Sequence, residues 1–134
     1  MRDNIAVLKR STLATFLCLA LLAGRAAAEQ TREPPGPVMM VHFDYYPKDR
    51  ARIHALEQRL ATAIKRAGAG ELGETELHAD GNDGYLYLYG PDADRLYAVT
   101  RPILRSSPLM AGAEVTTHYG ARAQTFGLND HRAP

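Results

Sequence analysis

Residues 85–89 read Tyr-Leu-Tyr-Leu-Tyr, a strict alternation of aliphatic and aromatic side chains. Successive side chains of a β-strand point to opposite faces, so this period of two predicts a strand with leucines on one face and tyrosines on the other. The leucine face requires an apolar layer to cover it, whereas tyrosine rings with their hydroxyl groups can remain at a water-exposed surface. The chain is therefore expected to form a sheet that other elements cover on one face.

Two amphipathic helices can supply that cover. The first is predicted over residues 48–67, where apolar side chains recur at steps of three and four and Gly68 follows in a position suited to a left-handed helix end: Ile53, Leu56, Leu60, Ile64 and Ala67. The second is predicted to begin after Gly90-Pro91-Asp92, with Leu96, Val99 and Ile103 as its apolar stripe. Pro102 is expected to kink this helix or end it early, because proline lacks a backbone donor.

Three further segments are predicted to be strands, residues 38–46, 71–79 and 113–119, and the turn formers at 80–84 are predicted to join two strands as a hairpin. The resulting order is β-α-β-β-α-β. This order commonly forms a four-stranded antiparallel sheet with both helices on one face, the ferredoxin-like sandwich of the α+β class. The first and third strands are then expected at the centre of the sheet, and the second and fourth at its edges.

The first 28 residues have the pattern of an export signal. Arg2, Lys9 and Arg10 precede an apolar run at 13–23, and Ala26 and Ala28 provide the small residues of a cleavage site. An 11-residue run is too short to span a bilayer, which needs roughly 20 residues. We expect a periplasmic or secreted protein, with an uncleaved anchor as the alternative. We expect three parts to follow the signal: a Pro-rich linker at 29–37, a domain at 38–120 and a polar tail at 121–134 that frays.

The composition of the chain after residue 28 argues against several classes of function. The one cysteine, Cys18, lies in the predicted signal, so the exported part has no disulfide and no thiol nucleophile. It carries 12 Lys and Arg against 14 Asp and Glu, a balance unsuited to neutralising a phosphate backbone. No nucleic-acid partner is expected, and no membrane contact after cleavage. Sequence motifs of serine hydrolases, zinc proteases and phosphate loops are absent, so catalysis is doubtful and no cofactor is expected.

One resemblance supports the predicted fold. Three stretches carry it: the helix entry Tyr89-Gly90-Pro91-Asp92-Ala93-Asp94, the segment Arg101-Pro102-Ile103-Leu104 and the closing strand at 115–120. Together they resemble a family of small uncharacterised bacterial proteins with a YGPDAD helix entry. His118 stands where that family's pattern has arginine. The resemblance implies a ferredoxin-like fold over residues 38–120, and it carries no activity and no functional residues.

The helix-free face of the predicted sheet gathers aromatic and titratable side chains. Alternation places six candidate partner-binding residues on it: Tyr85, Tyr87, Tyr89, His42, Tyr46 and His118. Tyrosine buries a large area and keeps a polar tip, which suits a protein interface. We therefore expect a small non-catalytic binding protein, immunity- or inhibitor-like, that uses this face for a protein partner or for a homodimer.

Three other interpretations of this face remain open. The plainest is a half-solvated sheet whose rings pack flat and bind nothing. A second is a metal-binding protein, or a small hydrolase- or lyase-type enzyme, that uses His42, Asp44 and His118, since imidazole and carboxylate ligands suit zinc or copper. The third is stacking of nucleic-acid bases on the central strands, which the negative charge disfavours.

Overall fold

The computed structural model describes residues 35–130. The predicted signal at 1–28, most of the predicted linker and the last four residues of the predicted tail lie outside this range. Within residues 35–130, no helix has the length and apolar character needed to cross a membrane.

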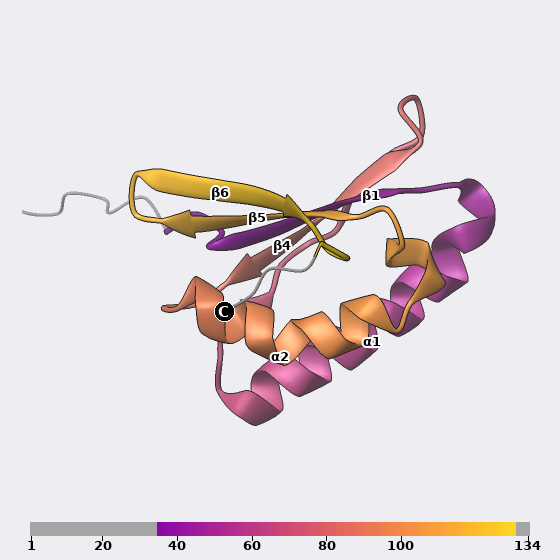
Figure 1. The fold of residues 1–134 in the computed structure, drawn as a ribbon. Coiled ribbons are helices and arrows are strands. Elements are labelled where there is room, and N and C mark those ends of the chain that lie inside the picture. Colours follow the sequence, from indigo (N-terminus) through magenta and orange to yellow (C-terminus); the bar gives the residue numbers. More distant parts are fainter. Residues whose placement is uncertain (1–34, 131–134) are drawn as a thin grey trace, which may run out of the picture. The chain divides into compact units, whose positions relative to one another are not determined.

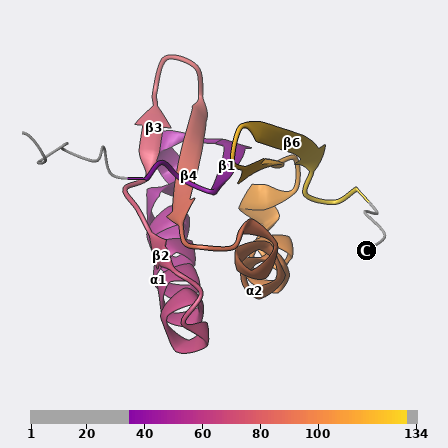
Figure 2. The same ribbon diagram turned by 90° about the vertical axis from the view of Figure 1, so that its left-hand side faces the viewer.

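The described residues form two layers, a sheet and a pair of helices that both lie on one of its faces (Figures 1 and 2). Two 3-10 turns precede α1 and β5, at Pro47–Asp49 and Pro108–Met110. The other elements in chain order are β1 (Met39–Asp44), α1 (Arg50–Ala67), β2 (Glu71–Leu72), β3 (Glu76–His78), β4 (Asp83–Tyr89), α2 (Ala93–Arg105), β5 (Glu114–Tyr119) and β6 (Arg122–Gly127).

The sheet has six strands, all paired antiparallel, in the order β2-β4-β1-β5-β6, with β3 also paired to β4. The prediction that the first and third strands are central is confirmed, since β1 lies between β4 and β5. The prediction of four strands is wrong in two places. The second predicted strand is interrupted between β2 and β3, and a strand forms after residue 120, where a frayed tail was expected.

The unexpected strand β6 is held by a tight turn and by apolar contacts. Gly120 adopts the left-handed conformation, with φ of 62°, and allows the chain to reverse into β6. Phe126 packs edge-on against Tyr97 of α2, with ring centroids 5.2 Å apart, and Leu128 is fully buried. The segment is mostly polar in sequence, so its pairing with β5 and the packing of these two apolar residues hold it against the domain.

The core lies between the sheet and the helices. On β4, Leu86 and Leu88 are fully buried, as the alternation predicted, and Val41 and Val115 are buried beside them on the neighbouring strands. The helices contribute side chains that are also at most 3% exposed, namely Ile53, Leu56, Leu60, Ile64, Leu96 and Leu104. The predicted inward face of the sheet is therefore confirmed.

The helix ends follow the sequence signals. Gly68 ends α1 with φ of 59°, and its backbone N–H bonds to carbonyl groups of the last turn. Asp92 caps α2 by accepting hydrogen bonds from the backbone N–H groups of Asp94 and Arg95, at 2.9 and 3.1 Å. Of the two effects expected of Pro102, a kink or an early end, the early end does not occur, because α2 continues past it to Arg105. The burial of Leu104 beyond the proline favours this continuation.

Candidate functional site

The face of the sheet opposite the helices carries the candidate site. We define the open face as the outward-pointing residues of β3, β4, β1 and β5: Glu76, His78, Asp83, Tyr85, Tyr87, Tyr89, Met40, His42, Asp44, Glu114, Thr116 and His118. These positions alternate with the buried residues of the same strands. The same pattern that builds the core therefore assembles this surface.

Aromatic rings on the open face pack around Tyr85. Its cross-strand partner is His42, and the two rings stack with centroids 4.6 Å apart and planes 21° apart. Tyr87 stacks along the strand at 6.2 Å, and His78 of β3 meets Tyr85 edge-on at 5.7 Å. Such contacts fix the positions of rings that remain partly exposed.

The same residues are joined by a continuous series of polar contacts. Tyr87 donates its hydroxyl hydrogen to Glu76 Oε2 at 2.6 Å, and Glu76 Oε1 lies 2.7 Å from His78 Nε2. His78 Nδ1 is 3.3 Å from Asp83 Oδ1, and Asp83 Oδ2 is 2.8 Å from His42 Nε2. The series thus alternates acidic groups with imidazoles across three strands, and each carboxylate contacts two partners.

These contacts shift the pKa values of the groups in known directions. The hydrogen bond from Tyr87 is the main cause that lowers the pKa of Glu76, and the same bond raises the pKa of Tyr87 to about 12. The bond to Glu76 raises the pKa of His78, and the bond to His42 lowers the pKa of Asp83. At neutral pH both carboxylates are therefore ionised and the Tyr87 hydroxyl is protonated.

Asp83 is a member of the site that the sequence analysis missed. It stands in the Asp80–Gly84 run of turn formers, which was assigned to the hairpin, whereas β4 already begins at Asp83. Continuing the Tyr85-Tyr87-Tyr89 alternation back by one step would have placed Asp83 on the tyrosine face.

The residues of the predicted metal site do not come together. His42 lies opposite Glu114 in the β1–β5 register, so His118 is four positions away, or about 13 Å along the strand. Asp44 lies opposite Asp83. Within residues 35–130 no group of three or more His, Cys, Asp or Glu side chains is placed to hold a metal ion. The Nε2 atom of His118 is instead buried without a hydrogen-bond partner in the described part of the chain.

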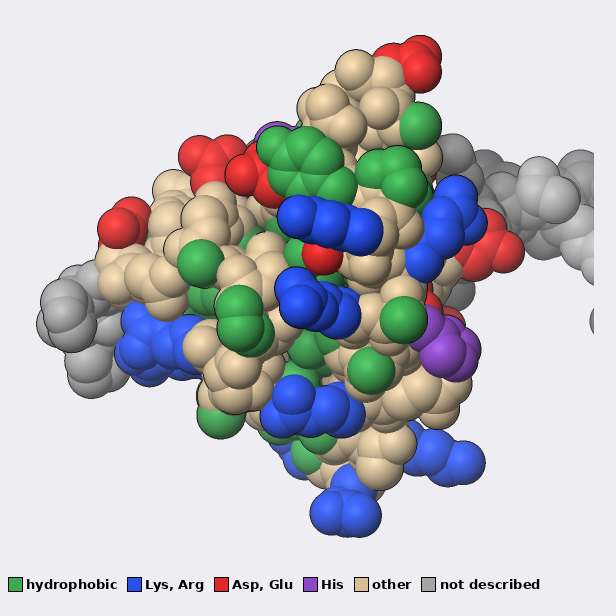
Figure 3. Space-filling model, turned by 90° about the vertical axis from the view of Figure 1, so that its right-hand side faces the viewer, with side chains coloured by type: hydrophobic (Ala, Val, Ile, Leu, Met, Phe, Trp, Pro, Cys, Tyr) green, Lys and Arg blue, Asp and Glu red, His purple; other side chains and the backbone are tan. Residues whose placement is uncertain are grey.

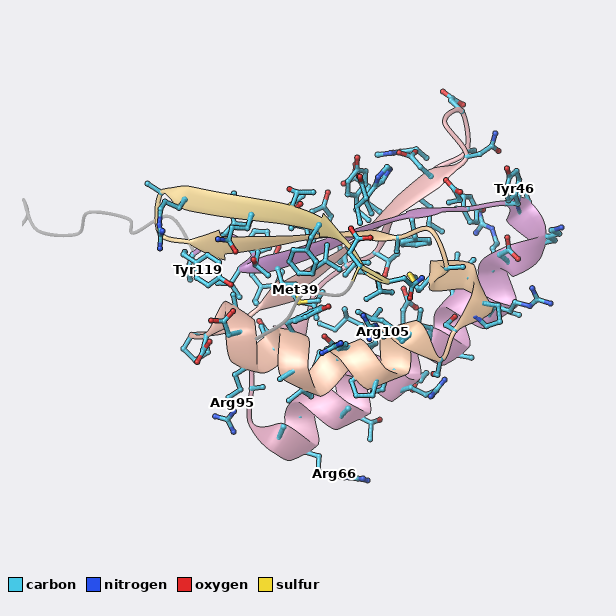
Figure 4. The ribbon with its side chains drawn as sticks, viewed as in Figure 1. Met39, Tyr46, Arg66, Arg95, Arg105 and Tyr119 are labelled. Carbon is cyan, nitrogen blue, oxygen red and sulfur yellow. The ribbon has the colours of Figure 1, made fainter. Side chains whose placement is uncertain are left out.

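Two of the predicted partner-binding tyrosines lie at the margins of the ring cluster. Tyr46 follows β1 at the start of the 3-10 turn, where its side chain is 50% exposed and lies near Lys48 (Figure 4). Tyr89 lies opposite Glu71 of β2, and its ring covers Gly73 so closely that a Cβ there would be 2.5 Å from a ring carbon. The centre of the site is therefore Tyr85 with Tyr87, His42 and His78.

The open face is acidic. It carries four carboxylates, Asp44, Glu76, Asp83 and Glu114, and none of its residues is Lys or Arg. Its polar groups also remain accessible, since the side chain of His42 is 37% exposed and that of His78 is 42% exposed. Such a surface can accept hydrogen bonds and attract cations, and its rings offer flat apolar area.

Comparisons with protein families, with curated proteins and with solved structures find no match to this chain.

Proposed function

We propose that this chain is an exported binding protein with a ferredoxin-like βαββαβ core, extended by β6, whose open face holds a protein partner. The strand order β2-β4-β1-β5, with both helices on one face of the sheet, supports the ferredoxin-like assignment. The signal-like first 28 residues support export to the periplasm or the medium.

The observation that carries the binding proposal is the preordered ring cluster. Tyr85 is stacked between His42 and Tyr87 while these side chains remain partly exposed. Association normally costs about 0.5–1.5 kcal/mol for each flexible side chain that becomes immobilised. Rings that are already held in place avoid most of this cost, which makes the cluster suited to an interface.

The charge of the open face indicates the chemistry of the partner. Four carboxylates without a Lys or Arg on the same face complement a basic surface. Two open faces brought together would oppose like charges, which disfavours a homodimer through this surface. The proposal is therefore an immunity- or inhibitor-like protein that covers a basic patch on a different protein.

Site-specific photo-cross-linking in cells that express the full chain tests this proposal. A photoreactive amino acid at Tyr87 should give a cross-linked adduct with another protein, and the same group at Ala61, exposed on α1, should not. The Tyr85→Ala substitution in the Tyr87-labelled chain should remove the adduct. Equal adducts from both positions, or adducts that contain two copies of this chain, would contradict the proposal.

A further inference from the structure

Charge is divided between the helices and the rest of the described chain. Helices α1 and α2 together carry eight Lys and Arg but two Asp and Glu, a net charge of +6. The other described residues carry two Lys and Arg against ten Asp and Glu, a net charge of −8. Figure 3 shows a column of Lys and Arg side chains down one side of the molecule. The helix layer is therefore basic, although the net charge of the described residues together is close to zero.

Three of these basic residues form a stripe along α1. Arg52, Arg59 and Arg66 are spaced by seven residues, so they lie on one side of the helix at intervals of about 10.5 Å. The stripe runs parallel to the helix axis for about 21 Å. Their spacing places three guanidinium groups along one line.

A surface depression in two parts lies beside this stripe, one part between α1 and α2 and the other between α1 and the segment that follows α2. One part, of about 410 Å³, is lined by Arg59, Ala63 and Arg66 of α1 and by Ile103 of α2. The adjoining part, of about 260 Å³, is lined by Arg52, Ala55 and Arg59 and by Leu109 after α2. Arg59 lines both parts, and we refer to the two together as the arginine groove.

The guanidinium groups of the arginine groove are largely available. Arg52 lies 3.7 Å from Asp49, and Arg59 donates a hydrogen bond to the Ser106 hydroxyl at 3.1 Å. Among the described residues, neither Arg59 nor Arg66 forms an ion pair with a carboxylate. The groove thus combines unneutralised positive charge with an apolar floor.

We propose that the arginine groove binds an acidic amphipathic helix of a partner protein. Carboxylates seven residues apart on such a helix repeat at the same interval of about 10.5 Å as the three arginines. The small side chains of Ala55 and Ala63 allow helix axes to approach to about 8–10 Å, and Ile103 and Leu109 offer aliphatic contacts. The helix would extend the α1–α2 layer.

The shape of the surface favours a helix over an anionic membrane. Helices that lie on a membrane surface insert protruding apolar side chains into it. Within residues 35–130, the one large hydrophobic residue that is exposed is Tyr46, which lies before α1 and not in the groove. The groove therefore offers apolar contact area but no protruding apolar side chain that could insert into a membrane.

Fluorescence anisotropy with the purified full chain tests the proposal. The probe is a labelled 18-residue helical peptide with glutamate at every seventh position and with leucine and alanine on the adjoining face. We expect saturable binding, and we expect the Arg59→Glu and Arg66→Glu substitutions each to weaken it by about tenfold. Within residues 35–130 Arg66 forms no ion pair that its substitution would remove, so its variant keeps the test valid if Arg59→Glu perturbs the fold.

A matched control is the Arg50→Glu variant. Arg50 is exposed on the same helix, about 200° around the axis from Arg52, and lines neither part of the groove. Its affinity for the peptide should stay within about twofold of the unmodified chain. Equal losses in the Arg50 and Arg66 variants, equal binding of a sequence-scrambled peptide, or tighter binding to phosphatidylglycerol vesicles than to the peptide would overturn the proposal. A null result here leaves the open-face proposal unaffected, because the two surfaces share no residue.

Discussion

The two faces of strand β4 differ in burial and in the kind of contact that their residues make. Leu86 and Leu88 are fully buried against the helices, and they make apolar contacts that have no directional requirement. Tyr85 and Tyr87, one residue away, remain partly exposed, with stacked rings and a hydrogen bond to Glu76. One face therefore holds the domain together, and the other displays ordered polar and aromatic groups.

The faces also differ in how their polar groups are satisfied. On the open face, each carboxylate and each imidazole of the Glu76, His78, Asp83 and His42 series has a polar partner within 3.3 Å. On the covered face, the Thr117 hydroxyl is buried without a hydrogen-bond partner within residues 35–130. The polar series is thus an ordered part of the open face, whereas a buried polar atom without a partner among the described residues, such as Thr117 Oγ1 or His118 Nε2, costs free energy on either face.

The largest loss of stability should come from shortening a buried side chain on the covered face. Leu88→Ala removes a fully buried side chain and should lower the free energy of unfolding by about 2–5 kcal/mol. Tyr85→Ala should lower it by about 1 kcal/mol, because the ring is partly exposed and its main loss is stacking. Urea unfolding of both variants measures the difference. A Tyr85 variant as unstable as the Leu88 variant would contradict the division between the faces.

A change of opposite sign is expected at Thr117. Valine has nearly the same shape, and the substitution removes a buried hydroxyl group that has no hydrogen-bond partner in the described part of the chain. Thr117→Val should therefore raise the free energy of unfolding by about 1 kcal/mol. Thr100→Val provides the matched comparison, because the Thr100 hydroxyl donates to the Leu96 carbonyl at 2.8 Å and should not show this gain. Destabilisation by Thr117→Val in thermal or urea unfolding would refute the interpretation.

The open face should make stability depend on pH in two directions. The pKa values of Glu76 and Asp83 are lowered from ordinary values of 4.5 and 3.8, so their contribution is complete above those values and is lost as pH falls through the folded pKa values. The pKa of His78 is raised from 6.5, so its contribution is complete below 6.5 and is lost as pH rises through the folded value.

The network is therefore expected to contribute most to stability between about pH 4.5 and 6.5. The unfolding free energy lost in a His78→Gln variant should be larger at pH 5.5 than at pH 8.5. His54→Gln, on exposed α1, is the control because His54 lies outside the network. An equal loss from His78→Gln at both pH values would show that its imidazole charge does not contribute.

The smallest expected effect is a shift in the pKa of one carboxyl group after a single hydrogen bond is removed. Tyr87→Phe removes the hydroxyl donor to Glu76, so the pKa of Glu76 should rise toward its ordinary value while the fold is unchanged. Carboxyl carbon shifts followed by NMR through an acid titration measure this pKa. Tyr97→Phe, on α2, should leave it unaltered. An unchanged Glu76 titration in the Tyr87 variant would place the cause of the shift elsewhere.

Local patterns predicted much of this structure because local forces govern the features concerned. The alternation at residues 85–89, the stripe ending at Gly68 and the start of α2 after Asp92 each depend on neighbours within a few residues. The failures have a different physical origin. Strand β6 depends on Phe126 meeting Tyr97, which is distant in sequence, and α2 passes Pro102 because tertiary packing outweighs one missing hydrogen bond.

The candidate site was predicted in part for the same reason. Alternation correctly assigned Tyr85, Tyr87 and His42 to one face, since facing is a property of a single strand. Which of these side chains touch depends on the register between strands, and no local pattern sets that register. It brought Asp83 to His42 and kept His118 about 13 Å away.

The sequence by itself determined the two helices, the central strands and the side of each strand that is buried, because backbone periodicity and hydrophobicity act over a few residues. The tertiary structure decided three other features: the sixth strand, the polar series from Tyr87 to His42, and the packing of α2 residues beside the α1 arginines to form the groove. Each of these requires residues far apart in the chain to meet, and only cooperative packing of the whole domain fixes which ones do.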